Sequence, residues 1–74
     1  MMTISEAKEV IKKGMRLILL SPIDDPYTPK APGDILTVTW VDDRGQIHGH
    51  WKSGGSIAII CDQDEYEIME DENE

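Results

Sequence analysis

All four prolines of this 74-residue chain fall in one segment, Ser21 to Asp34, which reads SPIDDPYTPKAPGD. Proline has no backbone N–H and a fixed φ angle, so it interrupts helices and is kept out of the central strands of a sheet. The segment is therefore expected to be a long, stiff connection. Every helix and strand of the chain must then lie before or after it.

The residues on both sides of this connection alternate in polarity with the period of two that is typical of strands. We expect five strands, in residues 15–21, 34–41, 46–52, 56–60 and 65–69. The sequences DDRG and SGG predict tight turns, the second leading as a hairpin into the fourth strand. An open sheet of short strands would leave two unpaired edges, so closure is favoured. The predicted fold is mainly all-β, a small five-stranded SH3-like barrel.

The N-terminal sequence TISEAKEVIKKG predicts a short helix. Thr3 and Glu6 have the spacing of a capping box, and Gly14 suits the end of a helix. An apolar stripe is expected to pack on the barrel, and it consists of Ile4, Ala7, Val10 and Ile11. The predicted organisation is a helix in residues 1–14, a barrel domain in residues 15–69 and a disordered acidic tail in residues 70–74.

The net charge of -8 comes from the C-terminal part of the chain alone. Residues 1–61 carry seven acidic and seven basic residues, whereas residues 62–74 carry eight acidic residues and no base. This acidity repels a phosphate backbone, so we do not expect direct binding of nucleic acid.

The longest apolar runs are far shorter than the roughly 20 residues of a membrane-spanning helix, and the N-terminus does not read as a signal peptide. Cys61 is the single cysteine, so no internal disulfide is expected and the thiol reads as a small buried hydrophobe. These features predict a cytoplasmic protein without membrane association. We expect a monomer or a weak homodimer.

Residues Gly14 to Met69 resemble domain-of-unknown-function family 4314, a family of small bacterial, phage and plasmid proteins. The resemblance covers about three quarters of the chain and rests on DDPYTPKAPG, TVTWVDDRGQIHGHW and GGSIAII, in this order. The chain departs from the family pattern at Leu36, where a glycine is usual, at Gly55, which replaces a hydroxyl residue, and at Cys61 and Asp62, which replace a Pro-Gly pair. The resemblance implies a small barrel associated with mobile genetic elements, and it implies no particular activity.

Two pairs of residues are candidate metal ligands. Asp24 and Asp25 lack the regular carboxylate spacing of a calcium loop, and Asp side chains next to a proline more often bond nearby backbone N–H groups and start a turn. His48 and His50 project from one face of a strand, but four clustered ligands are absent, so surface histidines are the better interpretation. No metal or cofactor is expected.

Catalysis is not expected either. The thiol and the two histidines have no diagnostic local context for a nucleophile and its base. Paired carboxylates are concentrated in the C-terminal segment, where solvation would keep their acidity ordinary. We therefore predict that the protein is not an enzyme.

The aromatic residues carry a clearer signal. Trp51 alternates with Ile47 and is expected in the core, whereas Trp40 has two interpretations. Strict alternation directs Trp40 into the core, but a bulge near Thr39 would turn it outward. If exposed beside Tyr27, it would form a groove wall of the kind that SH3-like folds use for extended or proline-rich segments.

The preferred functional hypothesis is a non-catalytic protein-interaction module of a phage or other mobile genetic element. Its expected partner-binding residues are Asp25, Pro26, Tyr27, Pro29 and Trp40. The first alternative is an acidic, nucleic-acid-mimicking inhibitor of a host defence or DNA-handling enzyme, acting through Asp62, Asp64, Glu65, Glu67, Glu70, Asp71 and Glu72. The second alternative is a nucleic-acid-binding small barrel.

Overall fold

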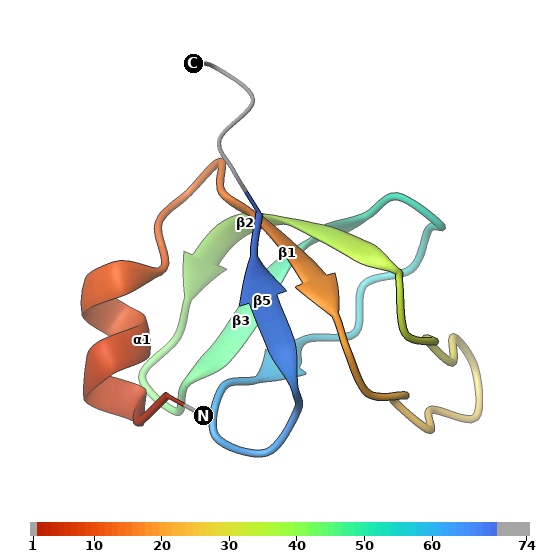
Figure 1. Cartoon of the computed structure of the whole chain (residues 1–74), viewed down its shortest axis with the longest axis horizontal. Coiled ribbons are helices and arrows are strands. Elements are labelled where there is room, and N and C mark those ends of the chain that lie inside the picture. Colours follow the sequence, from red (N-terminus) through yellow and green to blue (C-terminus); the bar gives the residue numbers. More distant parts are fainter. Residues whose placement is uncertain (1, 70–74) are drawn as a thin grey trace.

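The alternating segments form strands in the computed structural model, which describes residues 2–69 of the chain (Figure 1). The elements are α1 (Ile4–Val10), β1 (Arg16–Leu19), β2 (Ile35–Val41), β3 (Gln46–Trp51), β4 (Ile59–Ile60) and β5 (Tyr66–Ile68). The strands make one antiparallel sheet in the order β4-β3-β2-β1-β5. This confirms a mainly β fold with a short N-terminal helix. The sheet is not closed, because β4 and β5 form its two edges, so closure into a barrel is not confirmed.

The helix begins as predicted and ends earlier. The Thr3 hydroxyl accepts a bond from the Glu6 N–H, and the Glu6 carboxylate accepts one from the Thr3 N–H, so the capping box is complete. The helix ends at Val10, because Ile11 takes an extended conformation and is buried in the core. Gly14, with φ of 92°, then turns the chain toward β1, and its N–H donates to the carbonyl of Val38. No helix in residues 2–69 is long and apolar enough to cross a membrane.

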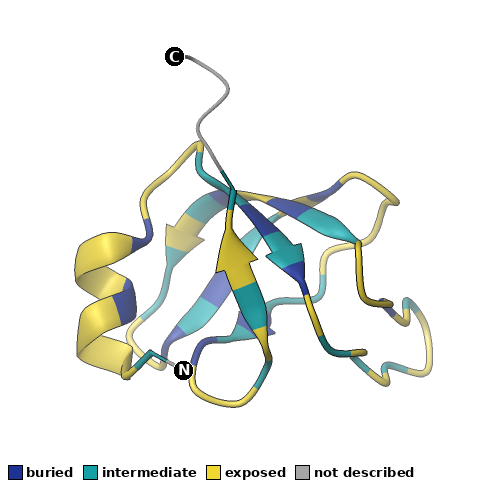
Figure 2. Ribbon diagram, viewed as in Figure 1, coloured by how far each residue is buried: buried dark blue, intermediate teal, exposed yellow. Residues whose placement is uncertain are grey.

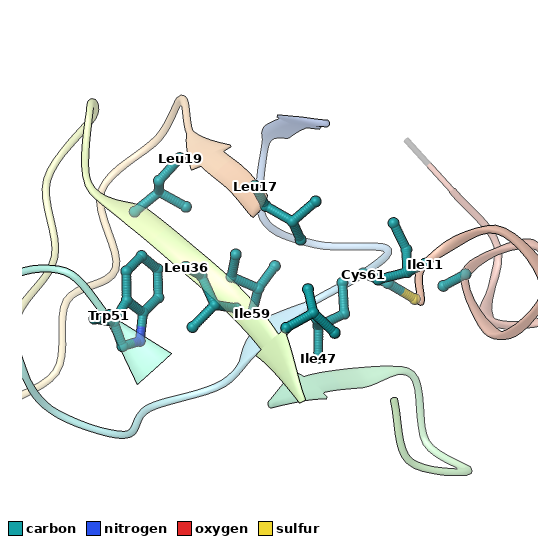
Figure 3. Close-up of a cluster of buried hydrophobic side chains, with 10 residues drawn as sticks. Ile11, Leu17, Leu19, Leu36, Ile47, Trp51, Ile59 and Cys61 are labelled. Carbon is teal, nitrogen blue, oxygen red and sulfur yellow. The ribbon is translucent and has the colours of Figure 1, made fainter. Parts of the chain in front are cut away.

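One hydrophobic core joins the helix to one face of the sheet (Figure 3). Its fully or almost fully buried members are Ala7, Ile11, Leu17, Leu19, Leu36, Val38, Ile47, Trp51, Ile59 and Cys61. Burial of each large apolar side chain contributes about 1.5–3 kcal/mol. The predicted helix stripe is narrower than expected, because Ala7 and Ile11 are buried while Ile4 and Val10 are 37% and 44% exposed.

The connection between β3 and β4 is longer than predicted. The expected tight hairpin is wrong, because β4 pairs only with Gln46 and Ile47, at the start of β3. Trp51, at the end of β3, is 4% exposed, and its indole Nε1–H donates to the carbonyl of Ile57 in the intervening residues 52–58 at 2.7 Å. A turn follows β3 directly, because the N–H of Gly54 donates to the carbonyl of Trp51 at 2.9 Å. The chain then continues past the indole ring, with Gly54 and Gly55 both at positive φ, instead of returning at once as a strand.

A β-bulge in β2 decides which way Trp40 points. Val38 pairs with Gly49, but Trp40 pairs with His48, so Thr39 is an extra residue in β2. Side chains of paired residues share a face, and the extra residue reverses the alternation after Val38. Val41 then pairs with buried Ile47, on the core side, while Trp40 turns outward. Of the two interpretations of Trp40, the exposed one is correct.

Gly49 allows this bulge because it has no side chain. A Cβ placed on Gly49 would overlap the carbonyl oxygen of Thr37 in the neighbouring strand. The two backbones can approach this closely only at a glycine. The hydroxyl of Thr39 also donates to the carbonyl of His48 at 3.1 Å, which fixes the bulge from its other side.

We predict that Gly49→Ala lowers the free energy of unfolding by about 3 kcal/mol or more, because the methyl group must push β2 and β3 apart. Urea denaturation followed by circular dichroism measures the change. His50→Ala, an exposed position in the same strand, serves as the control and should stay within about 0.5 kcal/mol of the parent protein. A Gly49→Ala variant as stable as the control would contradict this account of the bulge.

Candidate functional site

The proline-rich segment forms an ordered hairpin-like loop between β1 and β2. Ile23 and Lys30 exchange two backbone hydrogen bonds of 2.9 and 3.0 Å, which brings the two arms of the loop together. The base is closed by a bond from the N–H of Gly33 to the carbonyl of Leu19 at 2.8 Å. The loop therefore has a defined tip, which consists of residues 24–29.

Asp25 organises this tip from inside. Its Oδ2 accepts bonds from the N–H groups of Tyr27 at 2.9 Å and Thr28 at 2.7 Å. The bonds from Thr28 and Tyr27 lower the pKa of the Asp25 carboxyl, because they stabilise its charged form. Asp25 is thus the turn-forming Asp expected next to Pro26, and its carboxylate is already engaged within the loop.

Lys30 fixes the loop to the connection between β3 and β4. Its side chain is buried, and its Nζ donates to the hydroxyl of Ser53 at 3.0 Å and to the carbonyl of Gly54. The ammonium also lies 5.3 Å from the centre of the Trp51 ring, within the range of a cation–π interaction. At the tip, Thr28 packs so closely on Gly55 that a Cβ there would lie 3.2 Å from the Thr28 side chain.

The result is an aromatic side chain exposed on a fixed support. Tyr27 is 88% exposed, and the loop around it is largely exposed (Figure 2). All four prolines are exposed as well, at Pro22, Pro26, Pro29 and Pro32. The loop therefore presents proline rings and one tyrosine to solvent while its backbone is held by Asp25 and Lys30.

Trp40 forms a second exposed aromatic site. The residue is 57% exposed, and its ring stacks on that of His48, with ring centres 4.8 Å apart and planes inclined by 14°. The His48 ring is held by a 2.9 Å contact between its Nε2 and Oδ2 of Asp42. The bond with His48 is the main cause that lowers the pKa of the Asp42 carboxyl, and Asp42 also accepts the N–H of Gln46 and of Arg44.

The structure does not bring Tyr27 and Trp40 together. The loop joins β2 at Ile35, whereas Trp40 lies near the other end of the strand, a distance along the chain of roughly 17 Å at about 3.3 Å per residue. The far end of β2 lies beside α1, because Lys8 of the helix forms a 2.8 Å ion pair with Asp43 of the turn that follows β2. Figure 1 shows the helix and the loop at opposite ends of the sheet, the helix on the left and the loop on the right. The predicted partner-binding residues therefore form two separate surfaces.

Residues 62–69, the part of the acidic segment that the structure describes, contain one carboxylate that accepts a backbone hydrogen bond and three that are exposed. Asp62, Glu65 and Glu67 are exposed, and no ion pair within residues 2–69 involves them. Asp64 is half-buried and accepts the N–H of Ile60 at 2.8 Å. Glu70, Asp71 and Glu72, named in the acidic alternative, lie outside the described residues.

Groups with chemical reactivity are scattered or covered. Within the described part of the chain, no three His, Cys, Asp or Glu side chains lie close enough to hold a metal ion. Cys61 is fully buried, and burial, together with the charge of Asp62, raises the pKa of its thiol. His48 faces Trp40 on the neighbouring strand, and His50 is exposed.

Two residues that matter for these surfaces escaped the sequence analysis. Nothing in the local sequence distinguishes Lys30 from an exposed lysine. Its hydrogen-bond partners lie in a connection more than 20 residues away, so its burial depends on the tertiary structure. His48 was considered as a metal ligand, not as a stacking partner of Trp40. Its register opposite Trp40 depends on the bulge, which alternation alone does not reveal.

Comparison with known families gives a match over most of the chain. The family model described as Domain of unknown function (DUF4314) matches residues 2–69, which extends the resemblance seen in residues 14–69 through the N-terminal helix. Neither the curated proteins nor the solved structures give a match to this chain.

We predict that Lys30→Met lowers the free energy of unfolding by about 1.5–3 kcal/mol, because methionine keeps the apolar stem but loses hydrogen bonds from a charged donor. Chemical denaturation followed by tryptophan fluorescence measures the loss. Lys52→Met, at an exposed position, is the matched control and should change stability little. Equal stability of the two variants would show that Lys30 does not anchor the loop.

Asp25 should make the order of the loop tip depend on pH. The lowered pKa means that the charged carboxylate stabilises the folded loop fully above the ordinary Asp pKa of about 3.9, and this contribution is lost as the pH falls through the lower folded value. We therefore predict that the protection factors of the Tyr27 and Thr28 amides, measured by NMR and corrected for the intrinsic pH dependence of exchange, decrease at acid pH. Asp25→Ala should give this low protection at neutral pH. Asp24→Ala should behave like the parent protein, and equal effects of the two substitutions would refute the role of Asp25.

Proposed function

The chain belongs to the DUF4314 family, and we propose that this member is a non-catalytic protein-interaction module of a phage or other mobile genetic element, which binds a partner protein through its proline-rich loop. The observation that carries the proposal is the 88% exposure of Tyr27 on a loop whose backbone is fixed at the tip and at its anchor. A tyrosine on a flexible loop would support the proposal less well, because the loop would have to be ordered when the partner binds.

The energetic argument concerns the cost of ordering. Binding surfaces lose affinity when loops and side chains must be immobilised, and a loop ordered in advance avoids much of that loss. Four prolines, the Asp25 bonds and the Lys30 anchor all restrict the loop before any partner arrives. Tyr27 then contributes a large ring with only two rotatable side-chain bonds, and tyrosine is enriched among residues that dominate binding energy.

The chemistry of the loop suggests the form of the partner site. Tyr27 combines an apolar ring with a hydroxyl group, and the exposed rings of Pro26 and Pro29 stand on either side of it in the sequence. Such a tip fits a pocket that accepts the tyrosine ring, with a hydrogen-bonding group at its end and apolar walls at its rim. Asp25 supports this surface from within, since its carboxylate is taken up by the loop.

Trp40 provides a second contact surface for a partner in this proposal, near the end of β2 that is remote from the loop. Its stacking on His48 holds the ring in one orientation while more than half of it stays exposed. A partner of ordinary interface size, about 800 Å² on each side, would reach one of the two aromatic surfaces and need not cover both. We also propose an SH3-like relationship for the fold, supported by the strand order and by the long connection between β1 and β2.

The acidic alternative keeps one observation in its favour. Asp62, Glu65 and Glu67 are exposed and have no basic partner within residues 2–69, so this charge is available to a basic surface. An inhibitor acting through the whole acidic segment, residues 62–74, would depend strongly on the acidic residues after Met69 and on salt. Truncation after Met69 therefore separates the alternatives, because it removes acidic residues and leaves the proline-rich loop intact.

We predict that Tyr27→Ala reduces capture of the partner at least about tenfold in affinity purification from the native host, since a central aromatic contact is worth about 2 kcal/mol or more. The thermal midpoint of the variant should equal that of the parent protein, because the ring is 88% exposed. Lys13→Ala, at an exposed site on the helix side, is the control and should retain the partner.

Three other results of the same purification would be decisive. If Tyr27→Ala captured the partner fully and Trp40→Ala did not, the binding surface would be the one around Trp40. Full capture by both variants would refute the aromatic surfaces. Loss in the chain truncated after Met69, with strong salt dependence, would favour the acidic inhibitor.

A further inference from the structure

β5 ends the sheet, and its outer edge has no neighbouring strand among the described residues. The carbonyl of Glu65 accepts the N–H of Leu20 at 2.7 Å, and the N–H of Met69 donates to the carbonyl of Arg16 at 2.8 Å. Backbone groups on an antiparallel strand alternate between its two sides. The N–H and carbonyl groups of Tyr66 and Ile68 therefore point to the open edge.

A surface pocket of about 460 Å³ follows this edge. Its apolar lining comes from Met2, Leu20, Tyr66 and Ile68. All three residues of β5, which are Tyr66, Glu67 and Ile68, line this one pocket, so it runs along the strand. β1 covers one edge of β5, and the other edge is unpaired.

The apolar part of the pocket is open to solvent. Leu20 is 45% exposed, and Ile68 is 39% exposed although it pairs with buried Leu17, because β5 is an edge strand. Figure 2 shows β5 as the most exposed strand of the front of the sheet. The Tyr66 side chain that lines the pocket is held in place, because its hydroxyl donates to the carbonyl of Cys61 at 3.0 Å and it packs against the core.

The charge along this edge has one sign. Asp64, Glu65 and Glu67 line the pocket, and no basic side chain of residues 2–69 does. Glu65 and Glu67 project from the face of β5 opposite to that of Tyr66 and Ile68, so one face is acidic and the other is apolar. A strand laid beside β5 would meet carboxylates on one side and aliphatic or aromatic groups on the other.

We propose that β5 is a docking edge for an extended segment of a partner protein in which basic residues alternate with aliphatic ones. The segment adds to the sheet as a further strand beside β5 and forms backbone hydrogen bonds with Tyr66 and Ile68. Its aliphatic side chains enter the pocket beside Met2 and Ile68, and its lysine or arginine side chains pair with Glu65 and Glu67. Charge selects the segment, and the strand edge fixes its register.

A second copy of this chain does not fit the edge. Pairing of two β5 strands would place Glu65 and Glu67 of one copy next to the same carboxylates of the other, and like charges on opposed strands destabilise pairing. The charge of the edge also protects it from unwanted strand addition, since charged edge strands resist aggregation. The occupant must therefore bring positive charge.

This docking edge is separate from the proline-rich loop and does not rest on the function proposed for that loop. Tyr27 and Trp40 do not line the pocket. Substitution of Tyr27 should leave binding at β5 unchanged, so failure of one proposal and failure of the other are distinguishable.

The test uses a synthetic peptide of about seven alternating lysine and valine residues, titrated into the full chain labelled with nitrogen-15. We expect NMR shift changes centred on the amides of Tyr66, Glu67 and Ile68, together with slower exchange of the Tyr66 and Ile68 amides. Glu65→Gln combined with Glu67→Gln should weaken binding about fivefold or more, and Ile68→Ser should weaken it as well. Glu9→Gln, an exposed acidic residue on the helix, is the charge control and should leave binding unchanged.

A modified peptide separates strand addition from plain charge attraction. Methylation of three consecutive central amide nitrogens keeps every side chain and charge but blocks both edges of the peptide strand. The proposal requires that this peptide bind at least about tenfold more weakly. Equal binding of the two peptides, or shift changes spread over all exposed carboxylates, would show charge attraction alone and would overturn the docking edge.

Discussion

The close approach of β2 and β3 at Gly49 is the constraint on which most of the structure depends. Without a side chain at this position, the carbonyl of Thr37 can lie where a Cβ would otherwise be, and Thr39 can be accommodated as an extra residue. The extra residue reverses the alternation of β2, so that Val41 joins Ile47 on the core side. One missing methyl group thus determines both the packing beneath the sheet and the aromatic surface above it.

The buried ammonium of Lys30 is a second such constraint, at the end of the sheet where the proline-rich loop meets the connection after β3. A charge removed from water needs partners, and here it finds a hydroxyl, a carbonyl and the face of an indole ring. All three belong to the end of β3 and the connection that follows it. The proline-rich loop and residues 52–58 therefore form one packed unit around Trp51, and the loop derives its order as much from this unit as from its prolines.

Local patterns predicted the elements well, and long-range contacts decided the details. Alternation located all five strands, and the spacing of Thr3 and Glu6 located the start of the helix. The end of the helix was missed because Ile11 leaves it to reach the core, and the tight hairpin after β3 was wrong because β4 pairs only with the start of β3. Trp40 could not be placed, since the residues of β2 fit a regular and a bulged strand equally. The predicted Tyr27 site is exposed as a binding residue must be, whereas the free edge of β5 depends on strand order, which no local pattern contains.

The position of Cys61 has a practical consequence. The thiol is fully buried next to Ile11, and a Cβ on Gly45 would lie 2.7 Å from its sulfur, so the helix and the turn between β2 and β3 close over it from two sides (Figure 3). A reagent in solution reaches the sulfur only when these elements separate. Since the chain has a single cysteine, the rate of thiol alkylation under native conditions reports the population of such open states, and the protein carries its own probe of local opening around Cys61.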